Sequence, residues 1–203
     1  MAGQAKYTFV YEGSFGDLEK PAPHSRLLAA KKLAAHPFEL IIPIAIVPST
    51  AEPGDVELTP FPAKIDTGFG HNLAMSHEQF TSRRWANQNL DDYSPAGDTR
   101  GTFRLGDGRT GELSMYEADL WLISNRTRIE PLEINLEEGI GLFPEFHPDE
   151  YDEHGEYMPP DDPADSKKPL GPRLPLLGQR ALWMAGIKLE IDYANREFRL
   201  YKT

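Results

Sequence analysis

The chain has 203 residues and a formal net charge of −11, and it contains no cysteine. This length fits one domain of ordinary size that buries a core without disulfides. The absence of cysteine excludes thiol nucleophiles, disulfide frameworks and thiolate metal sites, and it favours a reducing compartment.

The acidic charge is concentrated in one segment. Thirteen of the 32 acidic residues lie within residues 130–166, which contain no Lys or Arg, and the other 19 nearly balance the 21 basic residues. No basic stripe suggests a nucleic-acid partner. The start of the chain does not have the pattern of a targeting segment, and the most apolar run, residues 38–47, is too short to span a bilayer. We therefore expect a cytoplasmic protein with no nucleic-acid or membrane partner.

Short elements separated by turn signals follow one another along the chain. In chain order we expect a strand at 6–13, a helix at 25–35, strands at 38–47 and 56–65, a helix at 76–89, a hairpin at 103–122, strands at 129–136 and 173–177, a helix at 179–185 and a hairpin at 187–201. The strands follow from β-branched and aromatic runs, and the start of the second helix from Ser76 with Gln79 three residues later. This pattern predicts an all-β domain, closed or nearly closed into a barrel.

The sequence divides into an extension and a domain with an insert. Residues 1–36 predict an N-terminal extension or arm, and residues 37–203 predict the domain. An acidic, Pro-rich insert at about 143–172 interrupts the domain. Its composition provides little apolar surface to bury, so we expect a mobile loop.

One aspartate stands where an apolar strand enters a tight turn. Residues 63–68 read AKIDTG, which places Asp66, Thr67 and Gly68 directly after the strand expected at 56–65. The Thr67 hydroxyl is suited to a local hydrogen bond, and Gly68 permits the close approach of a second backbone. The tripeptide alone is also an ordinary turn sequence. Its position after an apolar strand favours a carboxylate held at a fixed point.

In this context the chain resembles the retropepsin-like aspartic proteases, the clan of the retroviral proteases and of small bacterial relatives. That family has a hydrophobic-hydrophobic-Asp-Thr/Ser-Gly motif, then a hydrophobic-hydrophobic-Gly motif, a short helix and a terminal strand. The matching segments here are residues 64–68 and 176–178, and Phe69 after Gly68 is similar to bacterial members that read Asp-Thr-Gly-Phe. The resemblance covers residues 38–201 apart from the insert. It implies an acid-protease-type closed β-barrel, a retropepsin-like single lobe with a short C-terminal helix.

The resemblance also implies an activity, which is cleavage of peptide or protein substrates by an aspartic endopeptidase that needs no cofactor and no metal. Two aspartates share one proton across a bound water, because two adjacent carboxylates do not both ionise readily. One carboxylate acts as the base for the water, and the other polarises the peptide carbonyl. The chain has a single such triplet, so the resemblance implies a homodimer with Asp66, Thr67 and Gly68 as the catalytic residues of each chain.

Several residues around the triplet are candidates for contact with the substrate. The resemblance implies a flexible hairpin over the site, and the glycine-rich residues 105–111 suit one, although an ordinary exposed turn explains them equally well. Phe69 either narrows a subsite or packs into the core. Arg180 lies one place later than the Arg that supports the retroviral dimer, so that role is not transferred. The predicted substrate contacts are Phe69, Gly106, Asp107, Gly108 and Gly178.

Other functions remain open at this stage. A chain of this fold is alternatively a catalytically inactive dimerisation or peptide-binding module, since fold does not fix function. Retention of Asp66, which repels its symmetry mate, favours the enzyme. The pair His77-Glu78 begins a zinc-protease motif, but Thr81 stands where the second His is required. The insert either lies near the cleft and affects substrate access, or is a solvated loop.

Overall fold

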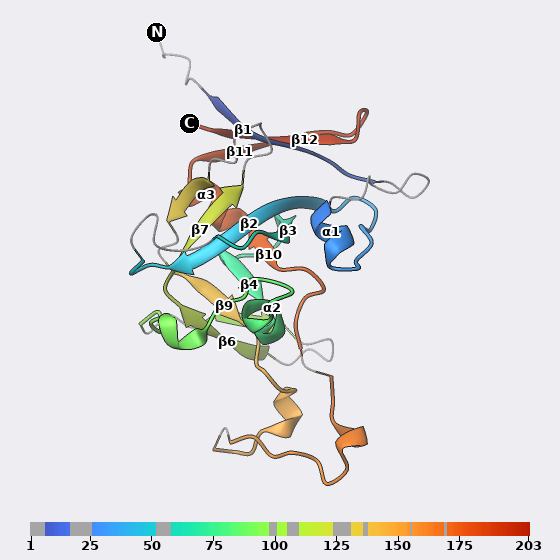
Figure 1. Cartoon of the computed structure of the whole chain (residues 1–203), viewed down its shortest axis with the longest axis vertical. Coiled ribbons are helices and arrows are strands. Elements are labelled where there is room, and N and C mark those ends of the chain that lie inside the picture. The colour runs from blue at the N-terminus through green and yellow to red at the C-terminus, as the bar shows by residue number, and fades with distance from the viewer. Residues whose placement is uncertain are drawn as a thin grey trace.

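Figure 1 shows a computed structural model of the chain, which describes residues 7–16, 26–51, 58–97, 101–104, 110–123, 131–135, 138–154, 156–168 and 170–203. The strands are β1 (Thr8–Ser14), β2 (Leu40–Pro48), β3 (Phe61–Asp66), β4 (Leu73–Met75), β5 (Gly101–Arg104), β6 (Thr110–Tyr116), β7 (Ala118–Ile123), β8 (Pro131–Asn135), β9 (Ile140–Leu142), β10 (Leu176–Gly178), β11 (Ile187–Asp192) and β12 (Glu197–Lys202). The helices are α1 (Arg26–Ala30), α2 (His77–Thr81) and α3 (Gln179–Met184), with 3-10 turns at Leu90–Asp92, Pro148–Glu150 and Pro163–Asp165.

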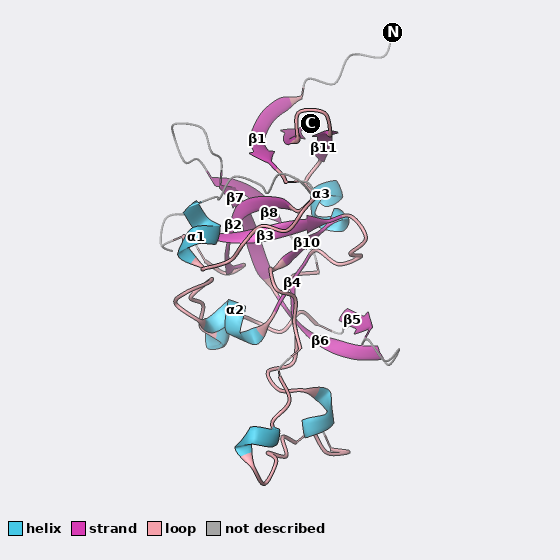
Figure 2. Ribbon diagram, turned by 90° about the vertical axis from the view of Figure 1, so that its right-hand side faces the viewer, coloured by secondary structure: helices cyan, strands magenta, loops and turns pink. Residues whose placement is uncertain are grey.

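The strands form two sheets, which lie one above the other in Figures 1 and 2. A three-stranded antiparallel sheet has the order β1-β12-β11, and a nine-stranded mixed sheet has the order β5-β6-β9-β4-β10-β3-β2-β7-β8. The expectation of a mostly β chain with few short helices is confirmed. In the ladders that the described residues form, β5 and β8 are the two ends of the larger sheet, so these ladders are open. The closed barrel therefore stays a prediction.

One hydrophobic core joins the two sheets. Phe198 and Leu200 of β12 are fully buried in the same cluster as Ile42 and Ile44 of β2 and Phe61 of β3. Strand β2 is apolar along almost its whole length, because β3 and β7 flank it and side chains on both of its faces are buried. Strand β1 pairs with β12, so the segment expected to be an arm contributes a strand to the smaller sheet.

The helix expected at residues 76–89 is shorter than the sequence predicted. It begins as expected, since the Ser76 side chain accepts from the Gln79 backbone N–H and the Gln79 side chain accepts from the Ser76 N–H. It ends at Thr81, after which the chain turns back and the N–H of Ala86 donates to the Gln79 carbonyl. A positive φ of 55° at Asn87 continues this turn. The tertiary turn therefore overrides the helix propensity of residues 82–89.

The acidic insert contains more local structure than its composition predicts. The rings of Phe146 and Tyr157 stack at 3.7 Å between centroids, and Tyr157 pairs with Tyr151 in an isolated β-bridge. Glu150 is buried and accepts hydrogen bonds from the Ser166 hydroxyl and the backbone N–H of residue 167. Three aromatic rings and one buried carboxylate thus organise a segment that is otherwise acidic and rich in proline.

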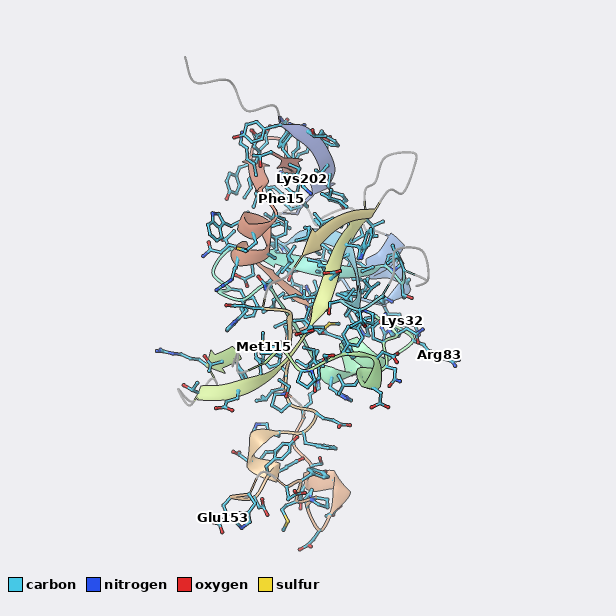
Figure 3. All side chains as sticks on the ribbon, turned by 90° about the vertical axis from the view of Figure 1, so that its left-hand side faces the viewer. Phe15, Lys32, Arg83, Met115, Glu153 and Lys202 are labelled. Carbon is cyan, nitrogen blue, oxygen red and sulfur yellow. The ribbon has the colours of Figure 1, made fainter. Side chains whose placement is uncertain are left out.

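The insert projects from one end of the molecule. In Figure 3, Glu153 marks the end of the insert, and Phe15 and Lys202 lie near the opposite end, in and beside the three-stranded sheet. Among the helices of the described ranges, none has the length and apolar character needed to cross a membrane.

Candidate active site

Asp66 lies at the last position of β3, where the strand enters a turn. Its carboxylate oxygen Oδ1 accepts a hydrogen bond of 3.0 Å from the backbone N–H of Gly68. The backbone carbonyl of Asp66 accepts from the N–H of Phe69, also at 3.0 Å. The turn thus holds the carboxylate in a defined orientation, while about a third of the side chain, 34%, stays exposed. The sequence predicted this fixed carboxylate from the strand–turn pattern.

The second motif of the resemblance lies directly beside the first. Strand β10 runs parallel to β3, with Gly178 opposite Asp66 in the register. The N–H of Gly178 donates to the carbonyl of Asn72 at 2.8 Å. A Cβ at Gly178 would lie 1.9 Å from the His71 carbonyl oxygen and 2.6 Å from that of Phe69. Only glycine therefore allows β10 to approach the loop that follows Asp66.

A lysine of the same strand contacts the second carboxylate oxygen of Asp66. The ammonium nitrogen of Lys64 lies 3.3 Å from Asp66 Oδ2, and the two side chains are 30% and 34% exposed. Side chains two residues apart on a strand share one face. The spacing of Lys64 and Asp66 in the sequence AKIDTG therefore predicts this pair, although the Asp-Thr-Gly motif does not include Lys64.

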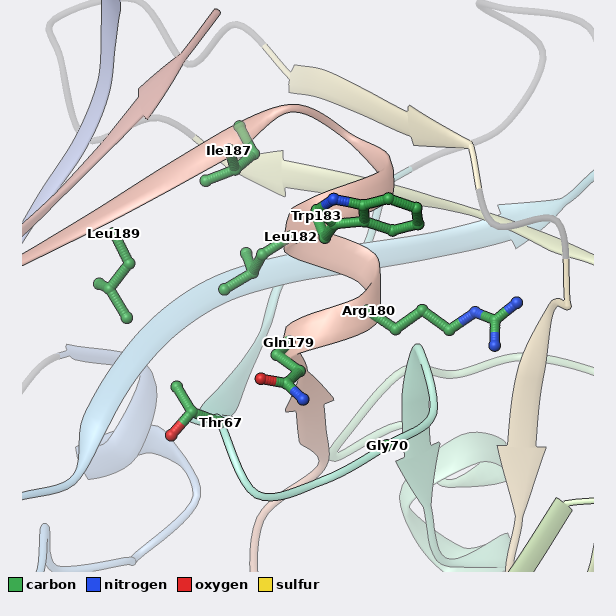
Figure 4. Close-up of a pocket in the computed structure, with 8 residues that line it drawn as sticks. All are labelled: Thr67, Gly70, Gln179, Arg180, Leu182, Trp183, Ile187 and Leu189. Atoms are coloured by element: carbon green, nitrogen blue, oxygen red, sulfur yellow. The ribbon is translucent and has the colours of Figure 1, made fainter.

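Two recesses flank the Asp66 turn, and Thr67 lines both. The first has a volume of about 690 Å³ and lies between the turn and the α3–β11 segment (Figure 4). Trp183 on its rim is 77% exposed, and Arg180 pairs with Glu138 at 2.7 Å. The lining residues are Thr67, Gly70, Gln179, Arg180, Leu182, Trp183, Ile187 and Leu189.

The second recess contains Asp66 itself and has a volume of about 480 Å³. Phe38 and Tyr193 border it with exposed aromatic rings, and Ile191 of β11 contributes an apolar wall. Glu39 in this recess is held by Arg173. Burial alone raises the pKa of Glu39, but the hydrogen bonds from Arg173 and from the His36 backbone N–H outweigh it, so the net pKa is lowered.

Phe38 occupies its exposed position in a strained conformation. Its φ is 62°, in the left-handed region that favours glycine, although 54% of the residue is exposed and its side chain is an aromatic ring. Backbone strain of this kind persists where the surrounding structure imposes it, and it is frequent at functional sites. The position of Phe38 beside Asp66 is therefore an argument for a role of this surface.

We expect the Phe38→Gly variant to be about 1 kcal/mol more stable than Phe38→Ala, because only glycine relieves the left-handed strain. Both variants lack the ring, so the comparison isolates the backbone. Chemical denaturation measures the two free energies of unfolding. Tyr193 is not among the residues with positive φ, so at this position the Tyr193→Ala variant should be more stable than Tyr193→Gly. An Ala variant that is the more stable at both positions would contradict the assignment of strain to Phe38.

The other predicted substrate contacts have different environments. Phe69 packs against a small buried cluster that contains Ala74, Leu113 and Met115, which favours the packing alternative, and its contact with substrate stays a prediction. Gly178 is buried against the loop after Asp66, so its visible role is structural. The predicted flap residues lie outside the described residues: Gly106, Asp107 and Gly108.

A larger cleft lies elsewhere, between α2 and the root of the insert, with a volume of about 1030 Å³. Asp66 and Thr67 do not line it. Two of its cations are already paired, Lys167 with Asp149 and Arg173 with Glu39. No insert residue lines either recess beside Asp66, so within the described ranges the insert is separate from the candidate site.

The described residues form no metal site, and comparisons with known proteins gave no match. Within the described part of the chain, no group of three or more His, Asp and Glu side chains is arranged to hold a metal ion. Comparison of the chain with family models, with curated proteins and with solved structures gave no match.

Proposed function

We propose that the chain is one half of a homodimeric aspartic endopeptidase, in which Asp66 of each chain acts on a water molecule bound between them. The observation that carries the proposal is the setting of Asp66. Its Oδ1 is fixed by the Gly68 N–H, its side chain reaches a recess, and Gly178 of the second motif lies opposite it in a parallel ladder. Two motifs that are far apart in the sequence thus meet at one carboxylate.

The chemistry follows from pairing two such carboxylates. Two carboxylates at close range retain one proton between them, because their joint ionisation is unfavourable. The ionised one removes a proton from the water, which attacks the peptide carbonyl, and the protonated one donates a hydrogen bond to the carbonyl oxygen. The donor to Oδ1, the Gly68 N–H, orients the carboxylate for both tasks. The substrate in this proposal is a peptide or protein.

The surface around Thr67 supports assembly into a dimer. Phe38, Trp183 and Tyr193 are 54%, 77% and 70% exposed, and each lines one of the two recesses that flank the Asp66 turn. Exposed aromatic side chains are typical of interaction surfaces. A two-fold axis beside Thr67 would bury these rings and bring the second Asp66 to the first.

The proposal extends to the fold. The order of the Asp-Thr-Gly turn, strand β10, the short helix α3 and the final β11–β12 hairpin agrees with the order of motifs in the retropepsin-like family. We propose that the two sheets, which share one core, correspond to the single lobe of that family. Closure of the larger sheet into a barrel is part of this proposal.

The inactive dimerisation or peptide-binding module has one observation in its favour. Lys64 pairs with Asp66 at 3.3 Å, so the carboxylate already has a partner within its own chain and does not depend on a second Asp66. In this second candidate, the exposed aromatic side chains bind a partner or peptide, and the only role of Asp66 is to stabilise the turn by accepting from the Gly68 N–H. The two candidates differ in whether any peptide is cleaved.

The concentration dependence of cleavage tests the dimeric enzyme. A diverse peptide mixture is incubated with the chain at graded concentrations from acidic to neutral pH, and the products are followed by mass spectrometry, with sedimentation on the same samples. We expect the rate per chain to rise with concentration and to level off as the dimer forms. A rate per chain that is constant while the chain sediments as a monomer would exclude the shared site. Absence of cleavage by the folded dimer would support the inactive module.

A further inference from the structure

Both oxygens of the Asp66 carboxylate are engaged within a single chain. Gly68 donates to Oδ1 from the backbone, and Lys64 contacts Oδ2 at 3.3 Å. Lys64 and Asp66 lie on one face of β3, and Lys64 also lines the recess that contains Asp66. The Lys64–Asp66 pair therefore forms within one strand and is present in every copy of the chain.

The other charged side chains that line this recess, His36 and Glu39, pair with each other, and Glu39 also pairs with Arg173. His36 and Glu39 reach the recess from the segment before β2, and Glu39 accepts from the His36 N–H. From β11 and the turn that follows it, the recess receives Ile191 and Tyr193. Within the described lining, Lys64 is thus the cation that faces Asp66.

We propose that Lys64 is the counter-ion that allows two copies of the chain to bring their Asp66 carboxylates together at neutral pH. The inference rests on the proposed dimer and adds a positioning residue to it. Before they share a proton, two ionised carboxylates that approach a two-fold axis repel each other, and an ammonium group beside each one offsets that repulsion. Each chain then presents a neutral Lys–Asp pair to its partner rather than a bare negative charge.

This role predicts a specific electrostatic signature. The pair is only partly buried, with side chains 30% and 34% exposed, so dissolved salt screens it appreciably. Loss of the ammonium group should therefore weaken the dimer most at low ionic strength. The weakening of the dimer should also depend on the charge of Asp66, because an ammonium group offsets no repulsion when the neighbouring side chain is neutral. A lysine that merely packs at the interface would show neither dependence.

The test measures the dimer dissociation constant by sedimentation at neutral pH and low salt, for Lys64→Gln, Lys64→Arg and the native chain. We expect Lys64→Gln to weaken the dimer about tenfold, since two pairs are lost per dimer. Lys64→Arg should stay within about twofold of native, because it keeps the charge. Lys168→Gln is the matched control for net charge, since Lys168 lies in the cleft at the insert root, away from Asp66.

The same substitution in an Asp66→Asn chain completes the cycle. With the carboxylate of Asp66 removed in this way, Lys64→Gln should change the dissociation constant by less than about twofold. An equal weakening in both backgrounds, or no weakening by Lys64→Gln in the native background, would overturn the counter-ion role. If the native chain still dimerises and cleaves peptides in those cases, the proposed function stands without this inference. A native chain that never dimerises would overturn both.

Discussion

Replacement of Asp66 by Asn should abolish peptide cleavage and leave the fold unchanged. The carboxamide neither removes a proton from water nor shares one with a second carboxylate, so the rate should fall by about 10³-fold or more. The fold should survive, because the carboxamide oxygen of the variant still accepts from the Gly68 N–H and the side chain at this position is one-third exposed. Mass spectrometry of a peptide digest measures the rate, and thermal unfolding measures the fold.

Mixing the two chains shows whether the site is shared. With nine Asp66→Asn chains for each native chain, and free exchange of partners, a native chain meets another native chain about one time in ten. Cleavage per native chain should therefore fall about tenfold, whereas a site complete within one chain would lose nothing. Asp161→Asn, an exposed carboxylate of the insert, is the control for the change of charge. Undiminished cleavage by Asp66→Asn itself would remove Asp66 from the mechanism.

Replacement of Gly178 by Ala should destabilise the fold and disturb the Asp66 turn. The added Cβ would lie 1.9 Å from the His71 carbonyl oxygen and 2.6 Å from that of Phe69, which are backbone atoms that have no side-chain rotamer to change. Either β10 or the loop must move, and the hydrogen bond from the Gly178 N–H to Asn72 is lost. We expect a loss of about 3 kcal/mol or more in the free energy of unfolding, together with lower activity.

Gly70→Ala is the matched control for this substitution. Gly70 lies in the same loop, no heavy atom lies within 4 Å of its added Cβ, and its φ is not in the left-handed region. Its free energy of unfolding should stay within about 0.5 kcal/mol of native. Denaturation of both variants under the same conditions gives the comparison. Equal midpoints for the two Ala variants would show that the contact between β10 and the loop is not tight.

The sequence by itself determined the local elements of this protein. Apolar runs predicted β2 and the final hairpin of β11 and β12, and a capping box predicted where α2 begins. The strand-then-turn pattern predicted a fixed carboxylate at Asp66. These features depend on neighbours within a few residues, which is the range over which propensity and periodicity carry information.

The tertiary structure alone decided what meets at the site. Strands β4 and β9 have three residues each, too few for periodicity to reveal. The sequence predicted a strand at 173–177, close to β10, but only the parallel pairing of β10 with β3 brings Gly178 beside Asp66. Phe38 is far along the chain from Trp183 and Tyr193, yet all three exposed rings line recesses beside the Asp66 turn. The early end of α2 depends on a turn in which the Ala86 N–H donates back to the Gln79 carbonyl. Such features arise from long-range packing, in which each residue's environment is set by parts of the chain that no local pattern relates to it.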